Sequence, residues 1–520
     1  MLHRTAPCWL THVLPLALLM VSGAGADPRL VDAARHQDFK TVRLLVGQHA
    51  DVNTRSDDGS TALLWAAHWN DLDAAEVLTQ AGADANAVND LQMTPLSQAC
   101  TNGSSKFVRL LLKAGAHPNT RIGTGETPLM TCARSGNVET IGILIEYGAE
   151  VNAKEPAQGQ TALMWAAAEH HLDVAKTLIQ AYADLRAHSK QGFTAMHFAA
   201  RRGDQEMVQL LLDAGVDVNI RSEVDAAPKG KGAAAERAAA APAGPALENV
   251  TRKTAGTIGY TALLVATVRG KVPLALYLLD HGADPNIGDA GFTPLHWAST
   301  EWENYTANRV YGFDDPMGGI PDRQAKLRLV KALLAHGANP NARMTKGQPQ
   351  VSGGYEDAIG ATPFLLASSV DDVETMRILL DAGADPKIPT ATNTTALMAA
   401  TGLNHGIGES PVTEAQALEA VKLLLGLGLD AKGATAFGEN ALFGPAYRGW
   451  NTLLAQLIDL GVDVNAVSKA GVTPWLAASG SGDRLGGVLF NNAGADLLLK
   501  HGADPKLGHP CEAQNKCRAD

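Results

Sequence analysis

The amino-acid sequence predicts an all-α solenoid of about twelve helix-turn-helix units joined by β-hairpin loops. The first observation is a short motif that returns at a spacing close to 33 residues, as in TALLWAA at 61–67, TPLSQAC at 94–100 and TPLMTCA at 127–133. The second is an apolar segment after each motif, such as VRLLLKAGAHPN at 108–119, which ends in Gly-Ala-Asp or a close variant. The third is length, because 520 residues exceed what one hydrophobic core usually supports. A fixed period in so long a chain indicates a stacked array.

Each motif predicts a short first helix followed by a second one. The motif's threonine, for example Thr61, is a good N-cap, and the proline or alanine after it suits the first helical turn. The small alanines later in the motif allow a neighbouring helix to approach closely. The second helix carries Val and Leu at i, i+3 and i+4 and stops at a glycine suited to a left-handed C-cap. Asn, Asp and Gly beyond it predict a tight hairpin into the next unit. No single unit buries its apolar face, and therefore the units must stack.

The most literal copy of the motif is Thr293-Pro294-Leu295-His296-Trp297-Ala298. It resembles the Thr-Pro-Leu-His-x-Ala hallmark of the ankyrin repeat, and the 33-residue spacing is that family's period. The resemblance extends over roughly 27–508 apart from insertions. It implies an ankyrin-repeat solenoid whose members bind other proteins. Residues 27–53 resemble a polar, cap-like first repeat, and 473–508 an irregular closing repeat.

Interruptions of the period predict how the chain is organised. Two halves of the array are expected, separated by an Ala/Pro/Gly-rich insertion of low hydrophobicity that we expect to be disordered. The predicted segments are a signal peptide at 1–26, repeats at 27–221, the disordered insertion at 222–258, repeats at 259–508 with smaller insertions at 301–325, 342–360 and 403–413, and a polar tail at 509–520.

The first 26 residues have the composition of a secretory signal. Arg4 precedes an apolar stretch from Trp9 to Val21, and the small residues Ala24 and Ala26 suit signal peptidase. The apolar stretch is shorter than the roughly 20 residues that a membrane span needs. We therefore expect cleavage after Ala26, no membrane span afterwards, and a secreted protein in the bacterial periplasm or outside the cell.

Four cysteines remain after cleavage. Cys100 and Cys132 fall at small-residue positions within helices of neighbouring repeats, and we expect them to be buried, unpaired thiols. Cys511 and Cys517 lie in the polar tail, where we expect a short disulfide loop in an oxidising compartment. A metal site that adds His509 to this pair is the weaker alternative, and no metal or other cofactor is expected.

The resemblance also predicts where a partner binds. In ankyrin repeats, partners usually contact hairpin tips and the residues that follow the Ala-Ala of the first helix, on the concave side. In this sequence those positions are His68, Trp69, Arg134, Glu169, Arg201, Arg202, Arg269, Tyr447 and Arg448. The alternative for each is an ordinary solvated helix face. Trp65, Trp165 and Trp297 lie earlier in the helix and are expected to be packing residues.

The insertion at 301–325 supplies a second candidate surface. Trp302, Tyr305, Tyr311 and Phe313 are concentrated there in a chain with only 5% aromatic residues. Aromatic residues beside arginine are typical of binding hot spots. The alternative, given equal weight, is that they fold back and pad the solenoid.

No catalytic motif is found in the sequence. His170 and His171 are adjacent in an inter-helix turn, so they cannot face one metal ion together, and solvent exposure is expected. A net charge of −11 gives no reason to expect nucleic acid as a partner. The sequence therefore predicts a non-catalytic protein–protein interaction scaffold in the periplasm or outside the cell. The alternatives are a secreted effector or inhibitor that binds a foreign protein, and an accessory subunit of an envelope enzyme.

Overall fold

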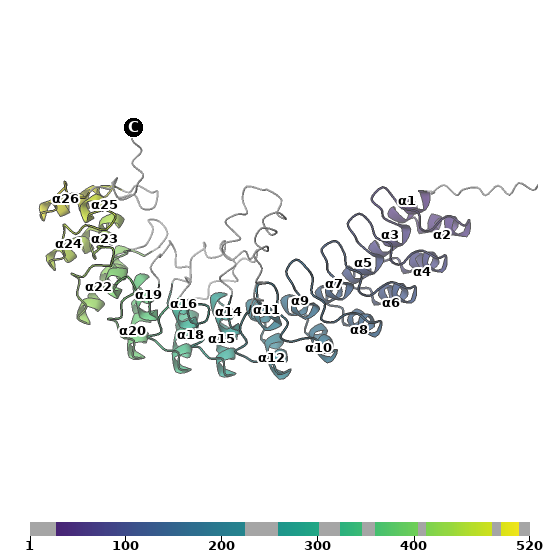
Figure 1. Ribbon diagram of the computed structural model, residues 1–520, viewed down its shortest axis with the longest axis horizontal. Helices are drawn as coiled ribbons and strands as arrows, with labels where there is room; N and C mark the ends of the chain where they lie inside the picture. Colours follow the sequence, from purple (N-terminus) through teal and green to yellow (C-terminus); the bar gives the residue numbers. More distant parts are fainter. Residues whose placement is uncertain are drawn as a thin grey trace, which may run out of the picture. The chain divides into compact units, whose positions relative to one another are not determined.

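The computed structural model describes residues 28–223, 258–300, 323–345, 359–403, 412–480 and 490–508. These residues contain 24 helices and no named β-strand, which confirms the predicted all-α repeat solenoid. The chain divides into two compact units, one of residues 1–123 and 127–149 and the other of 124–126 and 150–520. Each unit is a row of helix pairs stacked side by side (Figure 1). None of the described helices is long and apolar enough to cross a membrane.

Twelve helix pairs form the array, and we number them as repeats 1 to 12. The first unit contains α1 (Arg29–Arg35), α2 (Phe39–Gly47), α3 (Ala62–His68), α4 (Leu72–Gln80), α5 (Pro95–Thr101), α6 (Ser105–Lys113), α7 (Pro128–Ser135) and α8 (Val138–Glu146). The second unit contains α9 (Ala162–Glu169), α10 (Leu172–Gln180), α11 (Ala195–Arg202), α12 (Gln205–Asp213), α14 (Ala262–Val268), α15 (Val272–Asp280), α16 (Pro294–Ala298), α18 (Arg323–Ala335), α19 (Pro363–Ser369), α20 (Val373–Asp381), α21 (Ala396–Ala400), α22 (Glu414–Gly426), α23 (Phe443–Arg448), α24 (Asn451–Asp459), α25 (Pro474–Ala478) and α26 (Asn492–Lys500).

The predicted threonine caps start the first helices. Thr61 lies in an extended conformation before α3, and its hydroxyl oxygen accepts a hydrogen bond from the backbone N–H of Leu64 at 3.3 Å. Thr94 and Thr127 do the same for α5 and α7, where proline occupies the first turn. The first helix therefore begins at a fixed point of the motif, which sets which of its side chains face the neighbouring repeats.

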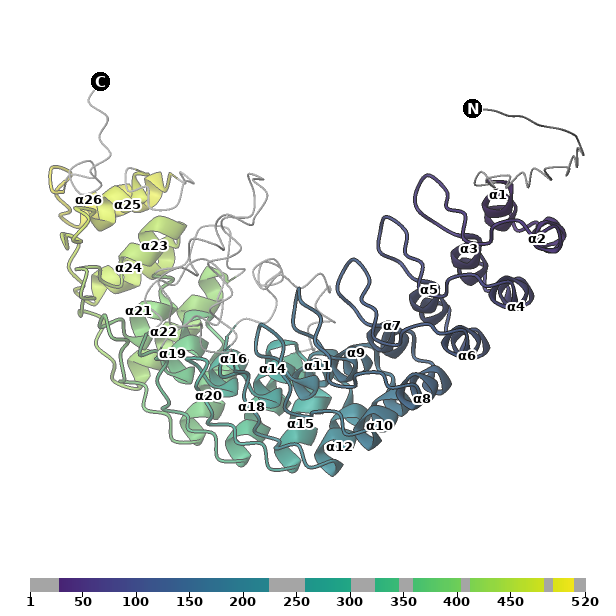
Figure 2. The ribbon, with the colours of Figure 1, turned by 45° about the vertical axis from the view of Figure 1, so that its right-hand side comes forward.

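Stacking buries the first helices almost completely. α3 packs against α1 on one side and α5 on the other, and also against its own second helix, α4. In Figure 2, α1, α3, α5 and α7 form one row of the first unit, and α2, α4, α6 and α8 form the other. The small side chains of Ala66 and Ala67 have no exposed surface, because the first helices meet through them. The second helices, in contrast, leave one face in solvent.

Asparagine side chains join the loops that follow successive second helices. Asn86 donates through Nδ2 to the carbonyl of Gly115 at 2.9 Å, and its Oδ1 accepts from the N–H of His117 at 2.8 Å. We call this paired contact an asparagine bridge. The same pair of hydrogen bonds is made by Asn53, Asn152, Asn219, Asn286, Asn341 and Asn465. Each bridge holds two neighbouring repeats in register.

The loops predicted as β-hairpins are turns rather than strands in the described residues. Isolated β-bridges join Arg55 to Thr61 and Ala434 to Asn440. Backbone hydrogen bonds also connect neighbouring loops, such as that from the Lys190 N–H to the Gln158 carbonyl at 2.7 Å. The loops therefore stack on one another as the helices do.

The predicted insertions lie largely outside the described residues. Where their ends are described, the array continues across them: Ser222 donates its N–H to the carbonyl of Tyr260 at 2.8 Å, and Met344 donates to Ala361 at 2.9 Å. The helix α18 begins at Arg323, inside the end predicted for the 301–325 insertion. The predicted signal peptide, the tail at 509–520 and the pair Cys511 and Cys517 are also outside the described residues.

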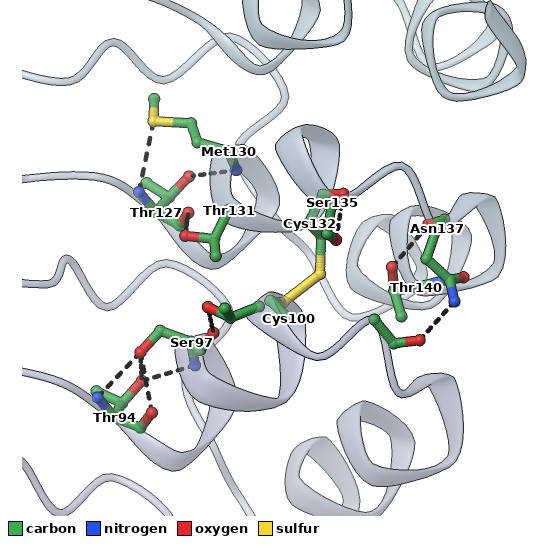
Figure 3. The surroundings of a disulfide bond; sticks show 12 residues. Thr94, Ser97, Cys100, Thr127, Met130, Thr131, Cys132, Ser135, Asn137 and Thr140 are labelled. Atoms are coloured by element: carbon green, nitrogen blue, oxygen red, sulfur yellow. Dashed lines mark hydrogen bonds between the residues drawn. A yellow bond between two sulfur atoms is a disulfide. The ribbon is translucent and has the colours of Figure 1, made fainter. Parts of the chain in front are cut away.

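The expectation that Cys100 and Cys132 are unpaired thiols is wrong. They form a disulfide between α5 and α7, with their Cα atoms 4.6 Å apart (Figure 3). Both cysteines are fully buried. Cys100 is the last residue of one motif and Cys132 the sixth residue of the next, and stacking places these two positions against each other. The prediction failed because each cysteine was considered within its own helix. The two cysteines are 32 positions apart in the sequence. Closing a loop of this length lowers the entropy of the unfolded chain, which stabilises the first unit by up to about 4 kcal/mol.

Two buried histidines connect repeats of the second unit. Nδ1 of His197 accepts from the backbone N–H of Thr194 at 3.2 Å, and Nε2 donates to the carbonyl of Tyr260 at 2.8 Å. His296 makes the corresponding contacts with Thr293 and Ala342. Burial lowers the pKa of both imidazoles to about 4, although the carbonyl contacts act in the opposite direction. Protonation of Nδ1 would replace an acceptor by a donor facing the threonine N–H, so only the neutral ring fits.

We predict that these histidines make the second unit sensitive to acid. Each of these two imidazoles binds its proton near pH 6.5 in the unfolded chain but only near pH 4 in the folded chain. Stability is therefore complete above the unfolded pKa and is lost as the pH falls from about 6.5 to about 4. Urea unfolding followed by circular dichroism at a series of pH values measures this loss. The double variant His197→Gln and His296→Gln should show a shallower dependence over that range, and an unchanged slope would contradict the assignment.

Tyr182 occupies a left-handed position that glycine fills in most repeats, for example at Gly215 and Gly282. Its φ is +62° and its side chain is 90% exposed. A side chain in this conformation costs roughly 1–2 kcal/mol, because Cβ crowds the backbone. We therefore predict that Tyr182→Gly raises the free energy of unfolding by about 1 kcal/mol, after allowance for the greater flexibility of glycine in the unfolded chain. Tyr182→Ala is the matched control because it keeps Cβ, and an equal gain for both variants in urea titrations would refute the explanation.

Candidate binding surface

The binding residues predicted on the helices all lie at the ends of first helices. His68 closes α3 and Trp69 follows it, Arg134 is in the last turn of α7, and Glu169 is the last residue of α9. Arg201 and Arg202 end α11, Arg269 follows α14, and Tyr447 and Arg448 end α23. Exposed side chains in this set are those of His68, Trp69, Arg134, Glu169 and Arg202, whereas the others are partly buried. Their role in binding stays a prediction.

In the first unit, the end of α3 belongs to a cluster of rings and one guanidinium group. The His68 ring meets the Trp65 ring edge-on at 5.5 Å and the Trp69 ring at 4.6 Å, both measured between centroids. The Arg35 guanidinium lies 5.6 Å from the centre of the Trp65 ring, close enough for a cation–π contact. Trp69 is 41% exposed, and its indole N–H donates to the Arg35 carbonyl at 3.2 Å. We call Arg35, Trp65, His68 and Trp69 the aromatic cluster.

Two members of the aromatic cluster were missed from the sequence. Trp65 was expected only to pack, but it is partly exposed, and within the described residues its indole N–H has no hydrogen-bond acceptor. Arg35 follows Ala33-Ala34 just as His68 follows Ala66-Ala67. It escaped notice because the first repeat lacks the threonine that marks the others. Aligning the Ala-Ala pairs instead of the threonines would have found it.

In repeats 5 and 6, residues at the first-helix ends hold the second unit together. Arg202 donates through Nη1 to the Ala168 carbonyl at 3.0 Å. His170 has a φ of +64° and contacts the buried carboxylate of Asp204 through Nδ1 at 2.5 Å, while half of its side chain remains exposed. The expected solvent exposure of the His170–His171 pair is therefore only partial. These contacts connect neighbouring repeats and leave Glu169 and part of Arg202 at the surface.

Repeats 9 to 11 carry a second group of charged residues. The Arg448 guanidinium lies 4.8 Å from the Trp450 ring centre. A Cβ on Gly402 would lie 2.9 Å from Arg448 Cδ, so a side chain there would displace the arginine. Asp371 has a φ of +52° and is 6% exposed, and its Oδ1 has no hydrogen-bond partner within the described ranges. Burial raises the pKa of Asp371 well above its usual value, and the charge of Arg448 offsets this only in part.

The adjacent residue, Asp372, has the opposite environment. Its carboxylate caps α20 and pairs with Lys326 at 2.9 Å and with Arg323 at 2.8 Å. Burial raises the pKa of Asp372, but Lys326 and the hydrogen bonds from Thr375 outweigh burial and hold the pKa at about 2. Lys326 also donates to the carbonyl of Thr300 at 2.8 Å, which ties α18 to the end of the preceding first helix. This cluster is a structural support beside the predicted 301–325 insertion.

The aromatic residues predicted in that insertion, Trp302, Tyr305, Tyr311 and Phe313, lie outside the described residues. Both roles considered for them, binding a partner and padding the solenoid, stay predictions. Trp297 is 6% exposed, which agrees with its prediction as a packing residue, while Trp165 is partly exposed.

Stacked helix pairs with a row of exposed first-helix ends define a helical repeat protein. A family model described as ankyrin repeats (3 copies) matches residues 30–122 and 129–222, and one described as ankyrin repeat matches 258–290, 290–345 and 359–391. These matches cover more than half of the chain, and the chain belongs to the ankyrin-repeat family. Ankyrin repeats bind other proteins, so the chain is a protein–protein interaction scaffold. The helix pairs from α21 to α26 continue the array beyond the matched residues.

A curated relative is the E3 ubiquitin-protein ligase KEG of Arabidopsis thaliana. The two sequences are 30% identical over 309 residues, which are 55% of this chain and 18% of the plant protein. The chain therefore spans less than a fifth of that relative's length. The likeness lies in a limited part of the ligase and assigns no ligase activity to this chain.

We predict that Asp371→Asn stabilises the second unit at neutral pH. The buried carboxylate has a raised pKa, so its contribution to stability is present below the unfolded pKa of about 4 and is lost as the pH rises through the folded pKa. The amide has no charge to desolvate and asparagine tolerates the left-handed backbone. Asp372→Asn is the matched control and should destabilise instead, because it leaves Lys326 buried without its counter-charge. Melting temperatures at neutral pH and near pH 4 measure both effects, and loss of stability in Asp371→Asn would overturn the interpretation.

Proposed function

We propose that this ankyrin-repeat chain is a non-catalytic scaffold that binds a partner protein in an oxidising compartment, the periplasm or the cell exterior. The observation that carries the compartment is the disulfide between Cys100 and Cys132. Disulfides persist in oxidising compartments and are rare where glutathione and thioredoxin keep thiols reduced. The signal-like composition of residues 1–26 supports the same location.

The aromatic cluster is the best-formed anchor for such a partner. Hot spots of protein interfaces are enriched in tryptophan and arginine, and the cluster presents both beside an exposed histidine. The Trp69 indole is held by the Arg35 carbonyl and the Arg35 guanidinium by the Trp65 ring. A surface whose side chains are already ordered loses less entropy when a partner binds. The cluster therefore supports binding through preformed geometry.

Three of the strongly shifted ionisable groups have structural roles, which supports a scaffold. Among the described residues, His197, His296 and Asp372 are buried and engaged in contacts between repeats or at a helix end. An accessory subunit of an envelope enzyme and a secreted effector or inhibitor remain the competing functions. Recovery of a bound enzyme from the envelope supports the first, and recovery of the chain from the medium in complex with a foreign protein supports the second.

The compartment is tested by mapping thiols in the protein as its source produces it. The chain, carrying its own first 26 residues, is alkylated before extraction and digested without reductant, and the peptides of Cys100 and Cys132 are identified by mass. We expect one crosslinked peptide pair in the exported fraction. Alkylated, uncrosslinked cysteines in protein recovered only from the reducing cytosol would refute the proposed location.

The binding surface is tested by proximity labelling and capture in the same compartment. We expect Trp69→Ala to weaken capture of the main partner at least tenfold, since hot-spot truncations cost about 2 kcal/mol or more. Leu44→Ala is the matched control, because Leu44 is 60% exposed but belongs to the second helix α2. Equal capture by both variants would exclude the aromatic cluster, and the absence of any enriched partner would count against the scaffold itself.

A further inference from the structure

The series of asparagine bridges is interrupted between repeats 5 and 6, as it also is farther along the chain where Lys387 and Lys432 take the asparagine position. Arg186 follows the second helix of repeat 5. It stands where repeat 4 has Asn152 and repeat 6 has Asn219. Asn219 donates to the Gly282 carbonyl at 3.3 Å and accepts from the Asp284 N–H at 2.8 Å. An arginine side chain has donors but no acceptor, so it cannot form both contacts.

The backbone groups that an asparagine would bridge are left without partners. They are the carbonyl of Gly215 and the N–H of Asp217, which correspond to Gly282 and Asp284 one repeat later. In the part of the chain that the structure describes, neither group forms a hydrogen bond. One acceptor and one donor therefore stand side by side, in the arrangement that seven other junctions fill with a carboxamide.

A cavity opens at the same junction. Its volume is about 380 Å³, and it lies between the loop after α10 and the loop after α12. Its lining includes Arg186, His188, Gly215, Asp217, Arg221 and Glu223. This volume is within the range of small-ligand sites, roughly 300–1,000 Å³. The missing asparagine bridge and the cavity thus coincide, and all of these residues belong to the second unit.

We propose that this cavity binds a primary carboxamide. The ligand's amide N–H donates to the Gly215 carbonyl, and its amide oxygen accepts from the Asp217 N–H. The structure supplies the precedent, since every asparagine bridge makes this pair of contacts. A carboxylate has no proton to donate to Gly215, and an ammonium group has no lone pair for Asp217. Of these three groups, only the carboxamide satisfies both backbone positions, and it does so in the arrangement of the asparagine bridges.

The surrounding charges suit a ligand with further polar groups. Among the described residues the Arg186 guanidinium has no hydrogen-bond or ion-pair partner and is exposed at the rim, where it can meet a carboxylate. Arg221 is turned to Asp289, with its Nε 2.8 Å from the carboxylate. The carboxamide can come from a free amino acid such as asparagine or glutamine, or from such a side chain in a partner protein. The site is separate from the first-helix ends, so it goes beyond the proposed scaffold function.

Ligand-observed NMR on the full chain tests the proposal with matched probes. The free probes are asparagine and glutamine against aspartate and glutamate. The peptide probes are Ala-Ala-Asn-Ala-Ala and Ala-Ala-Asp-Ala-Ala with an acetylated N-terminus and a C-terminal methylamide, which carry no other primary carboxamide. We expect each amide probe that binds to do so roughly tenfold more tightly than its carboxylate counterpart, the value of one hydrogen bond. Binding of the peptide alone identifies a partner's side chain as the source, and equal binding of the free amino acid identifies a small ligand.

Two variants make the test decisive. Arg186→Asn should restore the missing asparagine bridge, so amide binding is lost and the melting temperature of the full chain rises. Arg186→Ala removes the same guanidinium but leaves the cavity open, and it should retain the preference for amide over carboxylate. If Arg186→Asn does not fold, the comparison of probes on Arg186→Ala still decides. Equal binding of amides and carboxylates, binding that survives in Arg186→Asn, or no binding at millimolar concentration would each overturn the proposal. Capture of a partner through Trp69 is measured separately, so either inference can fail without the other.

Discussion

The close approach of successive first helices is the contact on which the other features depend. Alanine pairs such as Ala66 and Ala67 are fully buried between neighbouring repeats. The 4.6 Å between the Cα atoms of Cys100 and Cys132 measures how near two such helices come. At this distance the loops after the second helices are also in register, so asparagine bridges form. Larger side chains at these positions would separate the repeats and break contacts on both sides of the stack.

The fold could be predicted from the sequence because one pattern recurs eleven times. Threonine caps, alanine pairs and C-terminal glycines act locally, and their spacing fixes how the repeats stack. The disulfide was missed because it depends on two repeats at once, through the seventh position of one motif and the sixth of the next. Arg35 was missed because the first repeat has no threonine to mark it. A strained aromatic such as Tyr182 is visible in the sequence only as a departure from glycine.

The candidate surface was harder to predict than the fold, because the same side chains serve two purposes. The sequence places Trp69 and Arg202 at exposed helix ends, and the structure agrees. It does not reveal that Trp69 donates to Arg35 and Arg202 to Ala168 in the preceding repeats. In the sequence, a side chain that donates to a carbonyl of the neighbouring repeat cannot be distinguished from one that is available to a binding partner. The structure shows which atoms of each side chain contact the neighbouring repeat and which remain exposed for a binding partner.

The disulfide joins residues only 32 positions apart, in consecutive repeats. Contacts in a repeat array are made between nearest neighbours, so repeats 3 and 4 need no later part of the chain to bring the two sulfur atoms together. Closing the crosslink therefore requires two adjacent repeats and not the complete array. The first unit thus gains a covalent connection that does not depend on the folding of the repeats that follow it in the sequence.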